Sequence, residues 1–181
     1  MSARPKLIDC APREARFDFE TIFHLHYERI ARVIARVVQD PARAEELAVD
    51  VFWKLWRSPE AHGEQVGGWL YRTAVREGLY ELRRQLRRER YERLLRFLPG
   101  ARNPEEIHAA SEEREQVVRV LARIEKRQAE LLLLRSDGLS YQEVASALGL
   151  NPASVGTLIS RAREAFRKEY IRHYGENRNG R

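Results

Sequence analysis

Apolar residues recur at helical spacing along most of the chain. Between residues 17 and 38 they fall at intervals that share one face of a helix, at Phe19, Ile22, Phe23, Ile30, Val33, Ile34 and Val37. No segment shows the alternation of apolar and polar residues that is typical of a half-buried strand. The pattern therefore predicts an all-α fold.

Breaks in this pattern divide it into successive helices. Asp40 and Pro41 end the first helix and cap a second, whose apolar stripe covers residues 44–56. A loop rich in Pro and Gly at residues 57–68 leads to a third and longer helix, which runs towards Leu95. The second half of that helix is mostly charged.

Residues 97–111 include prolines, a glycine and acidic residues, which predicts a flexible acidic linker. We therefore expect two small helical domains, residues 17–96 and 112–173, between a flexible arm at residues 1–16 and a tail at residues 174–181. Each domain is small enough to be only marginally stable alone, so docking onto something larger would suit both.

The C-terminal domain carries the pattern of a helix-turn-helix. Gly138 suits the left-handed conformation that ends a helix, and Ser140 with Glu143 fits the capping box that begins the next one. That helix is short, and a turn at residues 149–151 separates it from a last helix with Pro152 at its first position. In a helix-turn-helix the second helix commonly enters the major groove of DNA.

The last helix divides into an inward and an outward face. Its apolar positions Val155, Ile159, Ala162 and Phe166 share one side and are expected to pack against the domain. Left at or near the outer side are Ser154, Thr157, Leu158, Ser160, Arg161 and Glu164. Small polar side chains and Arg can contact phosphates and base edges, so this face favours DNA binding over an ordinary helical hairpin.

The charge distribution also favours a polyanionic partner. The formal net charge is +6, and residues 69–96 hold nine Arg and four Glu, for +5. Residues 151–181 hold seven Lys or Arg and three Glu, for +4, so the remainder of the chain carries −3. The basic excess therefore lies in two segments, one of which contains the last helix of the helix-turn-helix.

Aromatic and cationic side chains are interleaved along the long third helix. The aromatics are Trp69, Tyr71, Tyr80 and Tyr91, and the arginines among them are Arg72, Arg76, Arg83, Arg84, Arg87 and Arg88. Unpaired bases stack on aromatics while arginine holds the backbone, so this pattern is typical of single-stranded nucleic-acid binding. Trp69 fits a core position equally well, and the arginines could form an ordinary solvated face.

The second helix has an acidic side. Glu45, Glu46 and Asp50 lie on the polar side of its apolar stripe, and Trp53 stands near the boundary between the two faces. An acidic face edged by an exposed Trp can bind a basic partner. An ordinary amphipathic surface helix has the same pattern, so both interpretations stay open.

Enzymatic and metal-binding motifs are absent from the sequence. His24 and His26 point about 200° apart around a helix and cannot share a metal ion, and no phosphate loop, dinucleotide fingerprint or nucleophile elbow occurs. Cys10 is the only cysteine, no apolar run approaches a bilayer span, and the N-terminus lacks the core of a signal peptide. We expect a cytoplasmic, non-catalytic protein with no membrane insertion, cofactor or bound metal.

Three stretches together resemble the sigma-70 family of bacterial RNA polymerase sigma factors, in its small extracytoplasmic-function (ECF) group. DPARAEELAVDVFWKLWR resembles the helix that docks on the clamp helices of RNA polymerase. GGWLYRTAVREGLYELRRQLRR resembles the promoter-melting helix, and RQAELLLLRSDGLSYQEVASALGLNPASVGTLISRAREAFRKEY resembles the domain that binds the −35 element. They occur in the family's order and cover about residues 17–96 and 112–170.

The resemblance implies a function and a set of sites. The chain would bind core RNA polymerase, at the β′ clamp helices and the β subunit, and direct it to promoter DNA, and an anti-sigma factor would hold it inactive. Polymerase binding would involve Glu45, Glu46, Asp50 and Trp53. The −10 element would contact Trp69, Arg72, Arg76, Tyr80, Arg83, Arg84 and Arg87, and the −35 element Asn151, Ser154, Thr157, Leu158, Ser160, Arg161 and Arg163.

Some residues depart from the family's usual pattern. Val49 stands where a Gln is usual, Arg76 where an Asn is common, and Tyr80 where an Asp is common. In the recognition helix, Gly156 and Leu158 replace a Lys and an Arg, which removes a candidate DNA contact. A helical Gly costs about 1 kcal/mol relative to Ala, so Gly156 suggests the close approach of another surface. Because of these departures, the promoter sequence that relatives recognise cannot be assigned to this chain.

Two other functions fit the same residues. One is a stand-alone helix-turn-helix regulator whose N-terminal half senses a signal or dimerises, and the other is a helical adaptor that binds only protein. A sigma factor co-purifies with core polymerase, whereas a stand-alone regulator footprints duplex DNA without it. An adaptor that binds only protein elutes from a heparin column at low salt. It makes no phosphate contacts, and such contacts are what make retention on heparin depend strongly on salt.

Overall fold

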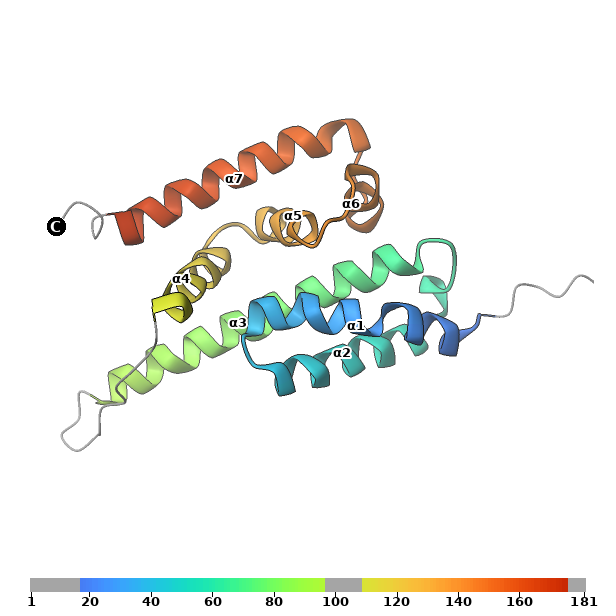
Figure 1. The fold of residues 1–181 in the computed structure, drawn as a ribbon, viewed down its shortest axis with the longest axis horizontal. Helices are drawn as coiled ribbons and strands as arrows, with labels where there is room; N and C mark the ends of the chain where they lie inside the picture. The colour runs from blue at the N-terminus through green and yellow to red at the C-terminus, as the bar shows by residue number, and fades with distance from the viewer. Residues whose placement is uncertain (1–16, 97–108, 176–181) are drawn as a thin grey trace, which may run out of the picture.

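A computed structural model describes residues 17–96 and 109–175 of the chain, and it is built from helices (Figure 1). They are α1 (Phe19–Val38), α2 (Pro41–Trp56), the 3-10 turn η1 (Pro59–Ala61), α3 (Val66–Arg96), α4 (Ala109–Arg123), α5 (Lys126–Ser136), α6 (Tyr141–Leu148) and α7 (Pro152–Tyr174). The described residues contain no strand, which confirms the predicted all-α fold.

Two helices extend beyond the bounds predicted for the second domain. The arm at residues 1–16 and the linker up to residue 108 lie outside the described residues, but residues 109–111, predicted as linker, begin α4. At the other end, α7 includes Tyr174, which the sequence pattern assigns to the tail. In this last turn Tyr174 packs on Tyr170, with 5.4 Å between the ring centroids.

Side chains cap the helix-turn-helix as the sequence predicts. Ser140 Oγ accepts a hydrogen bond from the Glu143 backbone N–H at 3.2 Å, and Glu143 Oε2 accepts one from the Ser140 N–H at 2.7 Å. These two bonds complete the capping box. Hydrogen bonding of the Glu143 carboxylate to the Ser140 side chain and backbone lowers the pKa of Glu143. Gly149 ends α6 with φ at 62°, and Asn151 Oδ1 then accepts the Ala153 N–H at 3.0 Å to begin α7.

The first unit of the fold is a bundle of α1, α2 and α3, which lie side by side in Figure 1. Asp40 caps α2 directly after α1 ends, by accepting the Arg43 N–H at 3.1 Å, so the chain reverses within a few residues. The bundle core consists of side chains that are at most 1% exposed, among them Ile30, Ile34, Phe52, Leu55, Leu70 and Ala74.

The second unit consists of α4 to α7, with α7 packed against each of the other three helices. The predicted inward face of α7 is confirmed: Val155, Ile159 and Ala162 are buried, and Phe166 is partly buried against the core. The outer side of α7 faces away from the first unit (Figure 1). This unit therefore presents the second helix of its helix-turn-helix to solvent.

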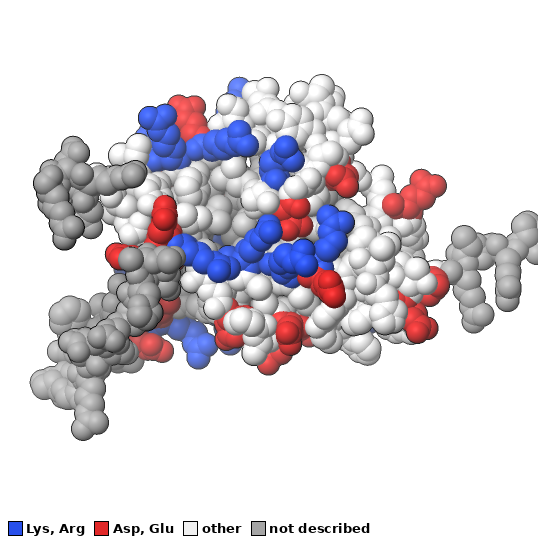
Figure 2. Space-filling model, viewed as in Figure 1, with Lys and Arg blue, Asp and Glu red and all other residues white. Residues whose placement is uncertain are grey.

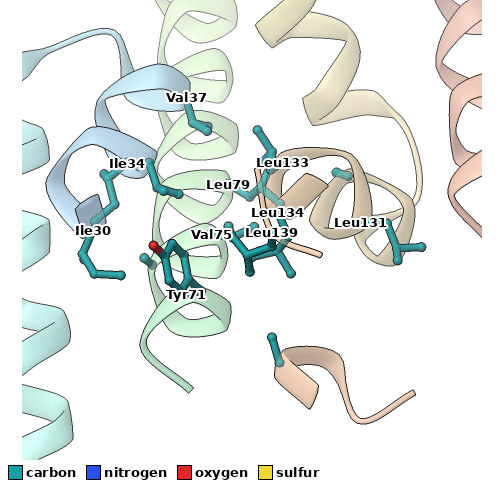
Figure 3. Close-up of a cluster of buried hydrophobic side chains, with 14 of the residues drawn as sticks. Ile30, Ile34, Val37, Tyr71, Val75, Leu79, Leu131, Leu133, Leu134 and Leu139 are labelled. Atoms are coloured by element: carbon teal, nitrogen blue, oxygen red, sulfur yellow. The ribbon is translucent and has the colours of Figure 1, made fainter. Parts of the chain in front are cut away.

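The two units pack against each other along α3. In addition to α1 and α2, α3 contacts α4, α5 and α6. Figure 3 shows Val75 and Leu79 of α3 meeting Leu133, Leu134 and Leu139 from the second unit, and all five belong to one buried cluster. The sequence predicted two marginal cores that need a partner, and in this structure each unit is the partner of the other.

Gly156 has its close neighbour within the second unit. A Cβ placed on Gly156 would lie 3.4 Å from Cε2 of the half-exposed Tyr141 side chain. The close approach that this glycine suggests is therefore to an aromatic ring of α6. Since that ring borders solvent, it can shift to make room for a methyl group.

We expect Gly156→Ala to raise the free energy of unfolding by up to about 1 kcal/mol, because Ala has the higher helix propensity. Chemical denaturation followed by circular dichroism measures the change. Gly149→Ala is the control of opposite sign, since a Cβ is strained at the positive φ of Gly149, 62°. A Gly156→Ala variant that is less stable than the parent chain would contradict this expectation and show that the Tyr141 ring does not shift.

Candidate polymerase and nucleic-acid interfaces

One side of α2 exposes an apolar surface. Val49, Trp53 and Trp56 are three or four residues apart, and their exposed fractions are 52%, 59% and 55%. With Phe19 and Phe23 of α1 they border a shallow apolar hollow of about 380 Å³. A contiguous exposed group with two Trp is typical of a protein-binding surface. Val49, Trp53 and Trp56 are called the α2 apolar face below.

The position of Trp56 corrects a sequence prediction. The apolar stripe predicted for α2 included Trp56, and the structure shows that this residue is exposed, unlike Leu55 and Phe52 of the same stripe. Trp56 is the last residue of α2 and packs edge-to-face on Phe19, with 5.2 Å between the ring centroids, at the rim of the bundle. Its spacing from Val49 and Trp53 is the sequence signal that could have placed it with them on the exposed side.

Acidic side chains border the α2 apolar face. Glu45 and Asp50 are exposed, and within the described residues neither has an ion pair. Glu46 is also exposed, but it accepts a hydrogen bond from Arg43 at 2.7 Å. Arg43 also lies 3.2 Å from Glu81 of α3, and the bonds to these two carboxylates raise the pKa of Arg43. Glu46 is therefore paired within the chain, whereas Glu45 and Asp50 can pair with a partner.

Four of the predicted −10 residues share one outer side of α3. Tyr80 is 63% exposed, and Arg84 and Arg87 follow it at helical spacing and are also exposed. Trp69 lies on the same side three turns earlier, half-buried against the core, and it lines a cleft with Ala147 of α6. These four residues are called the α3 outer stripe below.

The other three predicted −10 residues turn toward the second unit. Arg76 forms an ion pair with Glu130 of α5, at 2.9 Å between Nε and Oε1. Arg83 donates a hydrogen bond from Nε to the carbonyl of Ala122 in α4, at 3.1 Å. Burial lowers the pKa of Arg72. The sequence pattern treats all these arginines alike, and tertiary packing separates them.

Arginines from both units line one basic cleft. Figure 2 shows Lys and Arg side chains gathered across the middle of one face, with a second group in the upper part. A cleft of about 320 Å³ between α3 and α4 is lined by Arg83, Arg87, Arg90, Arg119 and Arg123. Arg119 and Arg123 come from α4, and no sequence signal brings that helix to α3.

The outer side of α7 presents most of the predicted −35 residues. Exposed residues there are Asn151, Ser154, Thr157, Ser160 and Arg161. Leu158 is a correction, because it is half-buried and packs against the core instead of facing outward. Arg163 is exposed but turns to the other side of α7, where it lines a groove.

That groove lies between α4, α5 and α7 and has a volume of about 1020 Å³. Its apolar lining consists of Val117, Val118, Leu121, Leu132, Leu133 and Phe166, and its arginines are Arg36, Arg114, Arg135 and Arg163. It is called the arginine-rimmed groove below. Sequence reasoning missed it, because its lining comes from helices that meet only in the folded chain.

The described ranges show neither a metal cluster nor a membrane span. Residues 17–96 and 109–175 contain no group of three or more His, Cys, Asp or Glu side chains placed to hold a metal ion. Among the helices described, none has the length and hydrophobicity needed to cross a bilayer.

Comparisons with protein families match both units. The sequence model of sigma-70 region 2 matches residues 22–88, and that of sigma-70 region 4 matches residues 114–166. The ECF RNA polymerase sigma factor SigK of Mycolicibacterium vanbaalenii is 30% identical over 147 residues, 77% of this chain and 73% of that protein. The ferric citrate uptake sigma factor FecI of Escherichia coli is 27% identical over 169 residues, 90% of this chain and 98% of that protein.

Solved structures have the same fold. The structure of CnrH in complex with the cytosolic domain of CnrY has a TM-score of 0.53 at 20% identity, covering 83% of this chain and 85% of that chain. The sigma factor RpoE from Bartonella quintana, in complex with the anti-sigma factor NepR, has a TM-score of 0.50 at 21% identity, covering 84% and 96%.

The helix order, the helix-turn-helix and both family matches agree with a sigma factor. They do not agree with a stand-alone regulator, the other DNA-binding function that the sequence left open. The chain belongs to the sigma-70 family, as an ECF sigma factor that binds core RNA polymerase and directs promoter-specific initiation of transcription.

Proposed function

We propose that this sigma factor binds polymerase, the −10 strand and the −35 duplex through three separate faces. The α2 apolar face, with Glu45 and Asp50, binds core polymerase at the β′ clamp helices. The α3 outer stripe contacts the melted −10 strand, and the outer side of α7 reads the −35 duplex. The family matches support this division, since α2 and the stripe fall within the region 2 match and the outer residues of α7 within the region 4 match.

The functional units we propose are residues 17–96 and 112–173, which contain the two family matches. RNA polymerase and its promoters are cytoplasmic, so we infer that the protein acts there. It works by recruitment and positioning rather than by catalysing a reaction.

Polymerase binding through α2 combines apolar and electrostatic contacts. The two exposed Trp side chains are suited to be the central anchors of an interface, because buried aromatics carry much of the binding free energy in such surfaces. Asp50 and Glu45 at the edge suit a basic partner surface and increase the rate of encounter. Val49, where the family usually has Gln, extends the apolar part of the face.

We expect Trp53→Ala to lower the affinity for core polymerase about 30-fold, the effect of removing an aromatic anchor worth about 2 kcal/mol. Asp50→Lys should weaken binding further and make it less sensitive to salt. Fluorescence anisotropy of labelled full-length chain titrated with core polymerase measures both. Leu25→Ala, an equally exposed apolar residue on α1, is the matched control and should bind normally. Equal Kd values for Trp53→Ala and Leu25→Ala would contradict the docking face.

Recognition of the −10 strand depends on stacking and on phosphate contacts. Tyr80 offers an exposed ring, and Arg84 and Arg87 lie on the same side of α3 to hold the backbone. The family's common Asp at the position of Tyr80 cannot stack on a base. We therefore infer that this chain grips the strand in a less sequence-dependent way at that point.

We expect Tyr80→Ala to reduce open complexes about 5-fold to 150-fold, since stacking of one base on an aromatic contributes about 1–3 kcal/mol. Permanganate reactivity of unpaired thymines at a promoter mapped for this factor gives the open fraction. Tyr91→Ala is the matched control, because Tyr91 is as exposed as Tyr80 but lies beyond the region 2 match. The same loss in both variants, or in neither, would argue against stacking at Tyr80.

An anti-sigma factor is the further partner we propose, and the arginine-rimmed groove is its site. The two solved structures of similar fold are each complexes with a second protein, one of which is named an anti-sigma factor. An apolar floor with four arginines suits an amphipathic helix that carries acidic residues along its edges. Arg36 belongs to the first unit, so such a helix would contact both units.

We expect Arg114→Glu with Arg163→Glu to abolish co-purification of the anti-sigma factor, because the acidic edges of its helix would meet like charge. Pull-down of the tagged full-length chain from its native cells, with quantitation of the bound anti-sigma protein, measures this. The control is Arg167→Glu with Lys168→Glu, two exposed α7 residues outside the groove with the same change in charge. If the Arg114→Glu, Arg163→Glu variant still retains the anti-sigma factor, the binding site for that partner lies outside the groove.

A further inference from the structure

The basic cleft between α3 and α4 is lined almost entirely by arginine. Apart from its five Arg side chains, the lining consists of Leu86 and Ala122, and it includes no acidic residue. The volume of about 320 Å³ suits a small ligand, since small-molecule sites begin at about 300 Å³. A cleft lined by one sign of charge concentrates ions of the opposite sign.

Contacts between α3 and α4 hold the two walls of the cleft in place. Leu86 of α3 and Ala122 of α4 are partly buried against the core, so the floor of the cleft is apolar. Arg119 of α4 forms an ion pair with Glu89 of α3 at 3.0 Å. Arg83 of α3 donates a hydrogen bond from Nε to the Ala122 carbonyl at 3.1 Å. The walls are therefore joined by two polar contacts that need no ligand.

Two of the five arginines bind partners inside the chain. Arg83 covers carbonyl oxygens at the C-terminal end of α4, the negative end of the helix dipole, which would otherwise repel an anion. Arg119 is paired with Glu89 and with Glu115. These two arginines therefore neutralise the negative groups that lie next to the cleft.

The other three arginines of the cleft are Arg87, Arg90 and Arg123. All three side chains are exposed, and within residues 17–96 and 109–175 none of them forms an ion pair or a side-chain hydrogen bond. Arg87 and Arg90 are three residues apart on α3, and Arg123 lines the same cleft from α4. Guanidinium groups gathered in this way repel one another, and a bound anion would replace that repulsion with attraction.

We propose that the basic cleft binds a small anion with several adjacent phosphate groups, either an inorganic polyphosphate or the phosphate chain of a nucleotide. Phosphate oxygens accept charge-assisted, paired hydrogen bonds from guanidinium groups. A chain of phosphates carries more charge in a small volume than a single phosphate, so it suits three cations better. A promoter strand fits a cleft walled by two helices less well, because sugars separate its phosphates.

The site shares Arg87 with the α3 outer stripe. A polyphosphate in the cleft therefore reduces the positive charge that is available to the melted −10 strand. This consequence rests on the proposed function of α3, whereas the site itself rests only on the cleft. Calorimetry without polymerase or DNA tests the site independently of that function.

Isothermal titration calorimetry of the full-length chain with sodium tripolyphosphate measures binding. We expect one ion per chain, bound at least about tenfold more tightly than orthophosphate and more weakly at higher salt. Binding should also raise the midpoint of thermal unfolding, because the anion binds the folded chain. Absence of measurable binding, or equal affinity for orthophosphate, would overturn the proposal.

Two double variants test whether the cleft is the binding site. Arg90→Gln with Arg123→Gln removes two of the unpaired arginines and leaves the predicted −10 residues unchanged. Arg88→Gln with Arg167→Gln makes the same change in net charge at exposed positions that do not line the cleft. Circular dichroism confirms that both double variants are folded.

We expect the cleft variant to bind tripolyphosphate about tenfold more weakly than the parent chain, and the control variant to change the Kd by less than about twofold. Equal losses of affinity in the two variants would show attraction by net charge alone and would overturn the site.

Two further ligands identify the source of the phosphates. ATP that binds at least as tightly as tripolyphosphate assigns the cleft to a nucleotide, and weaker binding of ATP assigns it to an inorganic polyphosphate; both results support the site. Oligo(dT) of about 20 nucleotides is titrated into the same variants. If the cleft variant loses as much affinity for oligo(dT) as for tripolyphosphate, the cleft is part of the nucleic-acid surface and the proposal fails.

Discussion

The α3 helix is buried on two sides, because it packs against both units of the fold. The rest of the structure depends on which of its side chains face each unit and which face solvent. One side supplies Leu70 and Ala74 to the first bundle, and another supplies Val75 and Leu79 to the interface with α5. Each unit alone has a small core, and together they form one continuous cluster. The same helix carries much of the basic excess, so its arginines must find acceptors inside the protein or remain in water.

Those internal acceptors resemble the groups that arginine binds on DNA. Glu130 presents a carboxylate, and the last turn of α4 presents unpaired carbonyls at the negative end of a helix dipole. A guanidinium donates to either kind of oxygen as it does to phosphate. The second unit therefore occupies the donors of Arg76 and Arg83, while Tyr80 and Arg84 stay exposed on the outer stripe.

The departures from the family pattern have different physical explanations. Arg76 has an acceptor in Glu130 and Leu158 packs against the core, so these two serve the packing of the chain. Gly156 lies against the Tyr141 ring, which can make room for a methyl group. Val49 and Tyr80 remain on the surface, where they add apolar and aromatic area to proposed binding faces. Leu158 thus stabilises the second unit at a position where an Arg would instead be available to DNA.

Local chemistry was sufficient to predict the helices and their caps. The capping box at Ser140 and Glu143, the turn at Gly149 and the inward face of α7 depend on neighbours within a few residues, so the sequence alone determined them. The side on which each arginine of α3 lies could not be predicted, because it depends on α4 and α5, which follow much later in the chain. The periodicity of α3 indicates two sides, but only the packing of the second unit decided that Arg76 and Arg83 turn inward while Arg84 and Arg87 stay in solvent. The arginine-rimmed groove and the exposed position of Trp56 were decided in the same way, by contacts between helices that no local pattern encodes.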